Sequence, residues 1–337
     1  MHGIQKLLNS YRNEIKGFAI LWVVFFHAQL RLEGLLYDIQ KIGYGGVDIF
    51  FFLAGYGLYH SLSGKKEGYL LRRAQRILPA YLPFCAVWLA VMIPLSQMDA
   101  RDALRTIAGN VLMLGYFFDT PLMINWYVSA LAASLLLAPM VYRCLRGDKA
   151  YWLRSVMILT AALVFDVLLV GNPKYMAISR IPVFLLGMIT AKPAVPGKDT
   201  PLVPSALGIG AAGALTVLML CFQRRPEWLL QYGMYWHPFI LIAPALCAGL
   251  GWLFSHLPCK CTAPLRCLGE ASFEIFLFNV WAELLGKRYG LGRDWLSWLA
   301  LSAGSIALGL LWHGILSSLK VLRLFQKKGL TARGKRW

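Results

Sequence analysis

The sequence is poor in charged residues. Asp, Glu, Lys and Arg together make up 15% of its 337 residues, whereas hydrophobic residues make up 58%. A water-soluble domain of this length usually has about a quarter of its residues charged. This composition excludes an ordinary soluble enzyme. Several apolar stretches of about twenty residues predict an all-α, polytopic membrane protein instead.

Acidic residues are the scarcer of the two charged kinds. There are 16 Asp and Glu against 34 Lys and Arg, which gives a formal net charge of +18. Such an excess could indicate binding to nucleic acid, but the chain has no soluble basic module for that purpose. In a membrane protein, an excess of Lys and Arg is typical of cytoplasmic loops. We therefore expect membrane lipids, and no nucleic acid, as partners.

The seven Cys residues match neither a disulfide framework nor a common zinc site. Four of them lie in or next to apolar runs, where Cys behaves as a small hydrophobic residue. The other three, Cys259, Cys261 and Cys267, cluster in one predicted loop near His256. We interpret them as reduced cytoplasmic thiols, and we expect no metal and no permanently bound cofactor.

The sequence also lacks an internal repeat, a low-complexity segment and the cleavage pattern of a signal peptide. The loops between its apolar stretches are short, apart from the segment that holds residues 104–118. They leave no room for a second globular domain. We therefore expect one integral membrane domain over residues 1–337, located in the plasma membrane.

Ten apolar stretches predict membrane-spanning helices. They cover residues 16–33, 45–62, 77–97, 124–143, 152–171, 177–191, 203–222, 236–255, 268–285 and 296–319. An eleventh stretch, 104–118, is short and contains Arg105 and Asn110. If it does not cross, about two thirds of all Lys and Arg residues fall on the side of the termini, as the positive-inside rule requires. This predicts ten crossings with both termini cytoplasmic, and a re-entrant or interfacial segment at 104–118.

The first predicted span contains ionisable residues at two depths. Lys16 and His27 are eleven residues apart, which is about three helical turns, so both lie on one face and roughly 16 Å apart along the axis. An ionisable residue within a membrane is costly and indicates a functional site. A lone intramembrane His could equally provide a hydrogen bond between helices. His237 and His313 are interpreted as packing or interface residues.

Asp48 lies near the outer start of the second predicted span, which a short loop joins to the first. We therefore expect Asp48 beside His27, where a carboxylate would fix the tautomer of the ring and stabilise the imidazolium. Asp48 could instead be the buried partner of an Arg or Lys.

Further polar residues could bind a polar acceptor. Those at the predicted depth of His27, toward the outer face, are Asn125, Trp126, Asp166 and Arg180. Glu274 lies in a later predicted span. It could bind a ligand or be paired structurally.

Five Lys and Arg residues form a cluster before the third predicted span. They are Lys65, Lys66, Arg72, Arg73 and Arg76. Arg73 and Arg76 share one helical face, and Lys16 lies at the same predicted level. Guanidinium groups match phosphate oxygens, so the cluster fits a ligand with several phosphates. It could also serve only to set the topology and to contact anionic lipid headgroups.

The residues just described resemble the motifs of the acyltransferase 3 family of integral membrane acyltransferases. The family has a basic residue, ten intervening residues and a His in its first span, which are Lys16 and His27 here. Residues 46–55, GVDIFFFLAG, are similar to the family pattern GVDIFFxLSG, with Ala54 in place of Ser. The family's RxxR corresponds to Arg73 and Arg76. Similar segments are 125–127, 179–187 and 272–277, and Asn279 stands where a His is often found.

The resemblance implies transfer of an acyl group, usually acetyl and sometimes succinyl, from cytoplasmic acyl-CoA. The implied acceptor is a hydroxyl group of an extracytoplasmic carbohydrate or a lipid-linked glycan, with glycan-synthesis machinery nearby. It also implies that His27 is the essential catalytic residue and that Arg73 and Arg76 bind the donor. To these we add Arg72 for the donor, Lys16 for the donor and as a catalytic residue, and Asp48 as the catalytic group that orients His27.

The sequence leaves two alternatives to an enzyme open. A transporter or flippase of a small polar or lipid-linked substrate would also have many spans, broken helices and an ionisable group near the midplane. A non-catalytic scaffold for polysaccharide machinery is the other.

Overall fold

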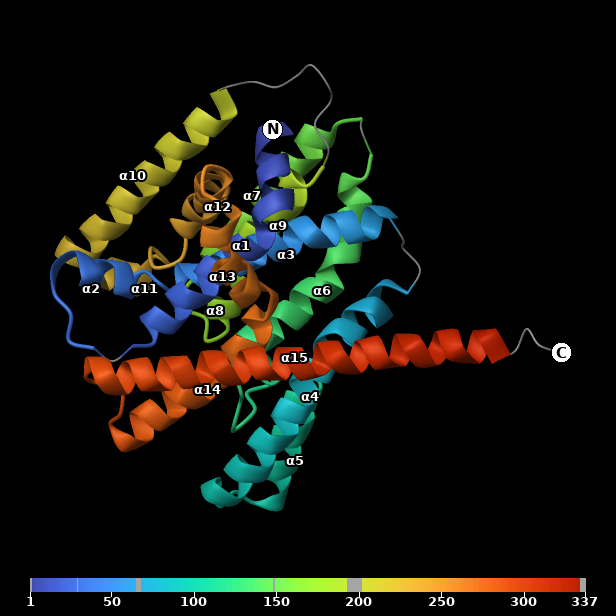
Figure 1. The fold of residues 1–337 in the computed structure, drawn as a ribbon. Helices are drawn as coiled ribbons and strands as arrows, with labels where there is room; N and C mark the ends of the chain where they lie inside the picture. Colours follow the sequence, from blue (N-terminus) through green and yellow to red (C-terminus); the bar gives the residue numbers. More distant parts are fainter. Residues whose placement is uncertain (1, 29, 65–67, 148, 193–201, 334–337) are drawn as a thin grey trace.

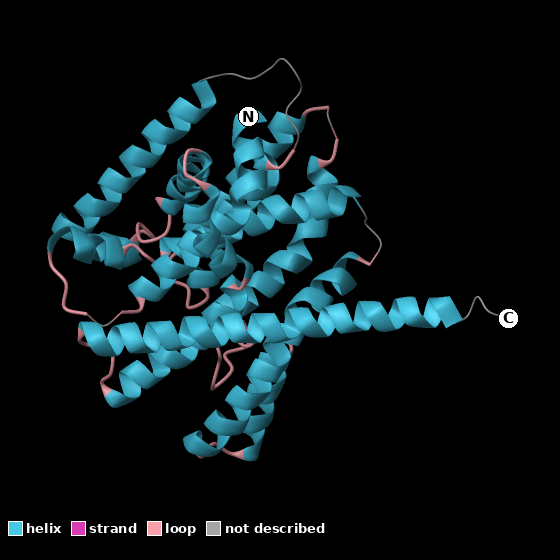
Figure 2. Cartoon of the chain, viewed as in Figure 1, coloured by secondary structure: helices cyan, strands magenta, loops and turns pink. Residues whose placement is uncertain are grey.

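A computed structural model of the chain describes residues 2–28, 30–64, 68–147, 149–192 and 202–333. These residues form α-helices joined by turns and short loops, with no β-strand among them (Figure 2). The all-α fold class predicted from the apolar stretches is confirmed.

Several helices have the length and composition of membrane spans. Within the described residues, five helices meet both criteria, or six if the bent pair α2–α3 is counted as one span. The five are α4 (Tyr69–Ser96), α6 (Trp126–Leu145), α7 (Tyr151–Leu168), α10 (Leu202–Arg224) and α15 (Trp295–Arg333). Many of their large apolar side chains are exposed, among them Leu168, Ile209 and Leu296. Exposed apolar surface of this extent is what lipid contact requires, so the chain is a multi-pass membrane protein.

The bent pair lies where the second span is predicted. It consists of α2 (Gly34–Lys41) and α3 (Gly45–Gly64), whose axes differ by 42°. The other predicted spans also coincide with helices, but these are shorter or contain more charged residues. They are α1 (His2–Phe26), α8 with α9 (Tyr175–Ile178 and Ile181–Thr190), α12 (Phe239–Ser255) and α14 (Ser272–Tyr289).

Two sequence-based boundaries need correction. The first helix begins at His2 and ends at Phe26, so it does not continue to residue 33. The segment predicted as a Cys-containing loop is a helix, α13 (Cys259–Glu270). Within residues 104–118, which the sequence predicts to be re-entrant or interfacial, α5 (Ala100–Val111) ends and turns follow. At 12 residues α5 is too short to cross a bilayer. A short helix, α11 (Pro226–Gln231), precedes α12.

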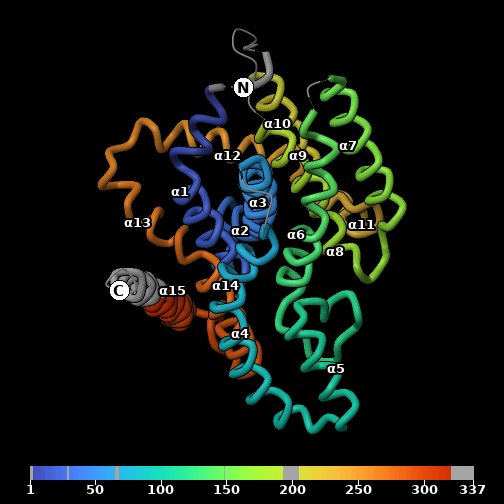
Figure 3. Tube along the Cα trace, turned by 90° about the vertical axis from the view of Figure 1, so that its right-hand side faces the viewer, coloured from blue at the N-terminus to red at the C-terminus, as the bar shows by residue number. Residues whose placement is uncertain are grey.

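The centre of the bundle is α3, which α1, α6, α9 and α12 surround (Figures 1 and 3). Glycines allow the central helices to approach backbone to backbone. A Cβ on Gly55 of α3 would lie 2.0 Å from the carbonyl oxygen of Phe184, and one on Gly187 of α9 would lie 2.0 Å from that of Phe52. Such small-residue contacts are a general means of packing helices in membranes.

The pair α1–α13 is packed in the same way, and an ion pair reinforces it. A Cβ on Gly269 would lie 1.7 Å from the carbonyl oxygen of Asn13. Near this contact, Nη2 of Arg266 is 2.7 Å from Oε1 of the buried Glu14. The hydrogen bond and the negative charge of Glu14 raise the pKa of Arg266. Residues 13–17 of α1 are therefore held against α13.

Replacing Gly269 with Ala is expected to destabilise the fold by about 1–3 kcal/mol, because two helix backbones must separate to admit the methyl group. Thermal unfolding of the purified protein in detergent would measure the loss. The matched control is Gly249→Ala in α12, where a Cβ would have no neighbour within 4 Å. That variant should be neutral or slightly stabilised, because Ala favours a helix over Gly. Equal unfolding temperatures for the two variants would contradict the close approach of α1 and α13.

Candidate active site

His27 lies directly after the C-terminal end of α1, at the wall of a small cavity. Two side chains of α14 face its ring. Nδ2 of Asn279 is 3.0 Å from Nδ1, and Oε2 of Glu283 is 3.6 Å from Nε2. The side chains of His27 and Glu283 are 24% and 25% exposed, so both can be reached from outside the protein.

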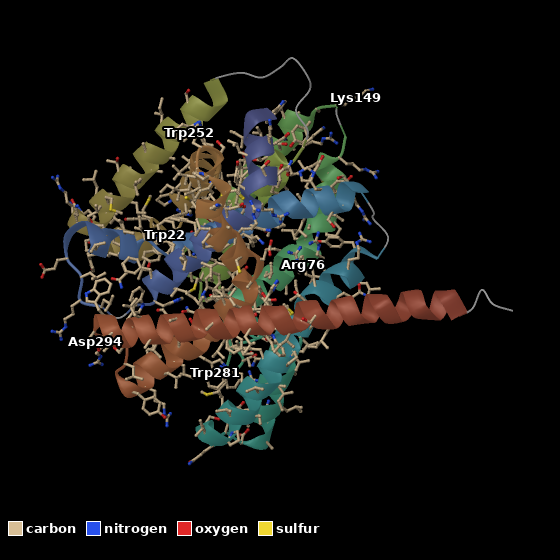
Figure 4. The ribbon with its side chains drawn as sticks, in the orientation of Figure 1. Trp22, Arg76, Lys149, Trp252, Trp281 and Asp294 are labelled. Carbon is tan, nitrogen blue, oxygen red and sulfur yellow. The ribbon has the colours of Figure 1, made fainter. Side chains whose placement is uncertain are left out.

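The cavity beside His27 is formed between α1, α14 and the start of α15. Its volume is about 20 Å³, and Trp298 and Ser302 of α15 complete its wall. A space of this size holds about one water molecule. Figure 4 labels Trp281, which lies on α14, and Asp294, which directly precedes α15.

Glu283 was missed by the sequence analysis, although a local signal exists. Asn279, Glu283 and Lys287 are spaced four residues apart, so they share one face of α14. Nζ of Lys287 is 2.5 Å from Oε1 of Glu283, and this contact restrains the carboxylate. A polar stripe on an otherwise apolar helix was therefore visible in the sequence.

Asp48 does not contact His27. Its Oδ1 is 3.4 Å from Nη1 of Arg180, and their side chains are 0% and 2% exposed. Asp48 lies on the first turn of α3, which packs against α9, and Arg180 immediately precedes α9. The predicted contact between Asp48 and His27 is therefore not formed. A fully buried carboxylate requires a cation, and Arg180 provides it.

The other residues predicted to bind an acceptor are also engaged within the fold. Oδ2 of the buried Asp166 is 2.9 Å from Nε2 of His237, and the hydroxyl group of Tyr175 is 2.8 Å from the same nitrogen. These three residues connect the end of α7, α8 and the start of α12. Asp166 and His237 are thus partners in one hydrogen-bonded group at the ends of three helices.

Asn125, Trp126 and Glu274 likewise have partners inside the protein. Oδ1 of Asn125 accepts a hydrogen bond of 2.7 Å from the backbone N–H of Tyr127 and caps α6. The guanidinium of Arg180 lies 5.5 Å from the ring centroid of Trp126. Oε1 of Glu274 is 3.2 Å from Nδ1 of His313. The cavity beside His27 is lined by other residues.

A group of cations lies between α1 and the start of α4. Lys16, Arg73 and Arg76 of the predicted cluster are members, and the structure adds Arg12. The charge of Arg12 is close enough to those of Arg73 and Arg76 to repel them, and Lys16 is repelled in the same way by Arg12 and Arg76. Arg72 interacts with Arg73 and lies on the same turn of α4. Lys65 and Lys66 lie outside the described residues. Figure 4 labels Arg76 near the beginning of α4.

Two guanidinium groups of this cluster retain hydrogen-bonding capacity. The Nε atoms of Arg12 and Arg73 are buried and have no hydrogen-bond partner. Nη2 of Arg12 donates to the carbonyl oxygen of Leu53 at 3.0 Å, in space that exists because residue 57 is Gly. A buried donor without a partner is unfavourable, and an anionic ligand would satisfy it. We name Arg12, Lys16, Arg73 and Arg76 the cationic cluster.

The protein is a multi-pass membrane protein, because its apolar helices have lipid-exposed faces. Its interior contains a polar site, which consists of the cationic cluster on α1 and α4 and of the His at the end of α1. A family model described as an acyltransferase domain matches residues 13–313, which is most of the chain. The protein belongs to the acyltransferase 3 family and is an acyltransferase. No curated protein and no solved structure matches it. Both the sequence-based resemblance and the prediction of an enzyme are thereby confirmed.

Proposed function

We propose that this protein transfers a short acyl group, acetyl or succinyl, from cytoplasmic acyl-CoA to a hydroxyl group of an extracytoplasmic carbohydrate or lipid-linked glycan. One observation supports this most strongly. Lys16 lies on α1, whose backbone is regular from residue 12 to its end at Phe26, and His27 follows that end directly. The interval of eleven residues from Lys16 to His27 corresponds to roughly 16 Å. A phosphate-binding cluster and a catalytic His are therefore connected by one rigid element.

The cationic cluster is suited to the phosphates of CoA. Arg12, Lys16 and Arg73 are half-buried and Arg76 is exposed. These four like charges repel one another, and a polyanion between them would relieve that repulsion. Arginine forms forked hydrogen bonds with phosphate oxygens, and the buried Nε atoms of Arg12 and Arg73 have no hydrogen-bond partner within the protein. The pantetheine arm would then extend along α1 toward His27.

The proposed topology has ten crossings, both termini in the cytoplasm and the plasma membrane as its location. The distribution of Lys and Arg supports this orientation. It puts the cationic cluster near the cytoplasmic face and the end of α1 near the outer face. The donor and the acceptor would then approach from opposite sides of the membrane.

At His27 two chemical routes are open. The ring takes the proton of the acceptor hydroxyl as a general base, or it attacks the thioester and forms a transient acyl-imidazole. The cavity of about 20 Å³ is smaller than either substrate group. We therefore propose that α14 and α15 move apart from His27 when the donor and the acceptor bind.

Product analysis tests the overall reaction. Membranes that contain the protein would receive acyl-CoA with a labelled acyl group, and the label would be followed into carbohydrate and lipid-linked glycan fractions. The proposal predicts an ester on one of these acceptors that mild alkali releases. Label in protein or in phospholipid alone would contradict the proposed acceptor class.

Replacing Arg76 with Ala is expected to raise the apparent KM for acyl-CoA about tenfold or more while kcat changes little. The reason is that a charge-assisted hydrogen bond to a phosphate contributes about 1.5–3 kcal/mol to binding. Initial rates at varied acyl-CoA concentration would measure it. Arg225→Ala is the control, because Arg225 is exposed and pairs with Glu227 on the surface. An unchanged KM for the Arg76 variant would leave the cluster with a topological role only.

A further inference from the structure

Glu283 has its carboxylate close to the ring of His27. Its Oε2 is 3.6 Å from Nε2 of the ring, which is longer than a hydrogen bond but within the range of an ion pair. Its Oε1 accepts a hydrogen bond of 2.5 Å from Nζ of Lys287. The carboxylate is thus restrained on one oxygen and directed at His27 with the other.

Asn279 determines which nitrogen of the neutral His27 ring carries the proton. Nδ2 of Asn279 is a donor, so Nδ1 of His27, 3.0 Å away, accepts. In the neutral ring the proton is therefore on Nε2, facing Glu283. When Nδ1 gains a proton as well, Nε2–H continues to face the carboxylate. The amide of Asn279 also has an oxygen, which accepts from Nδ1–H after the side chain turns over.

The buried carboxylates of α3, α7 and α14 have partners other than His27. Asp48 pairs with Arg180, Asp166 contacts His237, and Glu274 contacts His313. Glu283 is a residue that both lines the cavity and faces His27. Glu283 therefore occupies the position beside His27 that the sequence analysis predicted for Asp48.

We propose that Glu283 is a positioning residue, which stabilises the positive charge that forms on His27 during acyl transfer, and that Asn279 holds the ring in the tautomer that this requires. The inference rests on the proposed role of His27. It assigns to α14, and not to α3, the residues that support the catalytic ring.

Both chemical routes place a positive charge on the ring. In direct transfer, the acceptor hydroxyl displaces the amide of Asn279 from Nδ1, and Nδ1 takes the hydroxyl proton. The hydroxyl oxygen bonds to the acyl carbon, and the carbon–sulfur bond breaks. The thiolate then takes the proton from the imidazolium, so that free CoA leaves as the thiol. In the covalent route, Nδ1 bonds to the acyl carbon as the carbon–sulfur bond breaks, and the acylated ring is cationic until its other nitrogen gives its proton to the thiolate. The acceptor hydroxyl then attacks the acyl carbon, the bond from Nδ1 to that carbon breaks, and the hydroxyl proton returns to the ring. Glu283 stabilises the cation in either case.

The test compares Glu283→Gln and Glu283→Asp with the unaltered protein, in kinetics and in thermal unfolding. Glu283→Gln is expected to lower kcat about ten- to a hundredfold, a part of what general acid–base catalysis contributes. The KM for acyl-CoA should not change, because the cationic cluster is intact. Glu283→Asp retains the carboxylate and should recover part of kcat. Unfolding temperatures should stay close to that of the unaltered protein, because the side chain is partly exposed.

Glu227→Gln is the matched control. Glu227 pairs with the exposed Arg225 on α11, and its replacement should leave kcat unchanged. The inference is overturned if Glu283→Gln retains kcat within twofold, if its only effect is on KM, or if Asp restores nothing. Should His27→Ala retain activity, the proposed function itself fails. Should His27→Ala be inactive and Glu283→Gln fully active, only the role of Glu283 fails.

Discussion

Replacing His27 with Ala is expected to reduce the rate of acyl transfer by about a hundred- to ten-thousandfold, the range that a general acid–base group contributes. The imidazole faces the cavity between α1, α14 and α15, and Ala can neither accept a proton nor form an acyl intermediate. Transfer from labelled acyl-CoA in membrane vesicles measures the effect, after normalisation to the amount of folded protein.

The control for this experiment is His256→Ala. His256 caps the C-terminal end of α12, is exposed, and contacts Ser255 and the carbonyl oxygen of Trp252. This variant should retain normal rates, which excludes a general effect of removing a His from the protein. A His27 variant with more than a tenth of the normal rate would be incompatible with both chemical routes.

Loss of either partner of the Asp48–Arg180 pair is expected to destabilise the protein by about 3–5 kcal/mol, because the remaining charge would be buried without compensation. Asp48→Ala and Arg180→Ala should therefore accumulate poorly in membranes and unfold at lower temperature in detergent. The double replacement Asp48→Leu with Arg180→Met removes both charges and should recover most of the stability, since buried ion pairs can often be replaced by apolar residues.

The exposed pair Arg225–Glu227 provides the comparison, because a surface ion pair contributes at most about 1 kcal/mol. The same variants separate stability from catalysis. If Asp48→Asn unfolded normally and yet lost acyl transfer, Asp48 would act on the reaction, as the sequence predicts. If the double variant folded and retained activity, Asp48 and Arg180 would be structural.

Local spacing predicts part of the candidate site. The apolar runs predict the helices, and the eleven-residue interval predicts that Lys16 and His27 share a helical face, although α1 ends at Phe26, one residue before His27. Arg73 and Arg76 form a cluster because they are three residues apart on α4. Each of these predictions depends on contacts within one helix.

Contacts between helices could not be predicted in the same way. Asp48 was expected beside His27 because α1 and α3 are close in sequence, but its position on the first turn of α3 brings it to Arg180 instead. Asn279 reaches His27 from 252 residues away in the sequence. Which residues contact His27 depends on how α14 packs against α1 and α15, and hydropathy does not encode that packing. Arg12 was missed because α1 begins before the apolar run does.

The end of α1 at Phe26 has an electrostatic consequence for His27. The last carbonyl groups of a helix have no partners within it, and the aligned peptide dipoles give that end a partial negative charge. A cation at such an end is stabilised by about 0.3–1 kcal/mol. Because His27 follows Phe26 directly, the backbone of α1 favours an imidazolium there before any side chain contributes. The backbone of α1 and the carboxylate of Glu283 thus act on the ring in the same direction.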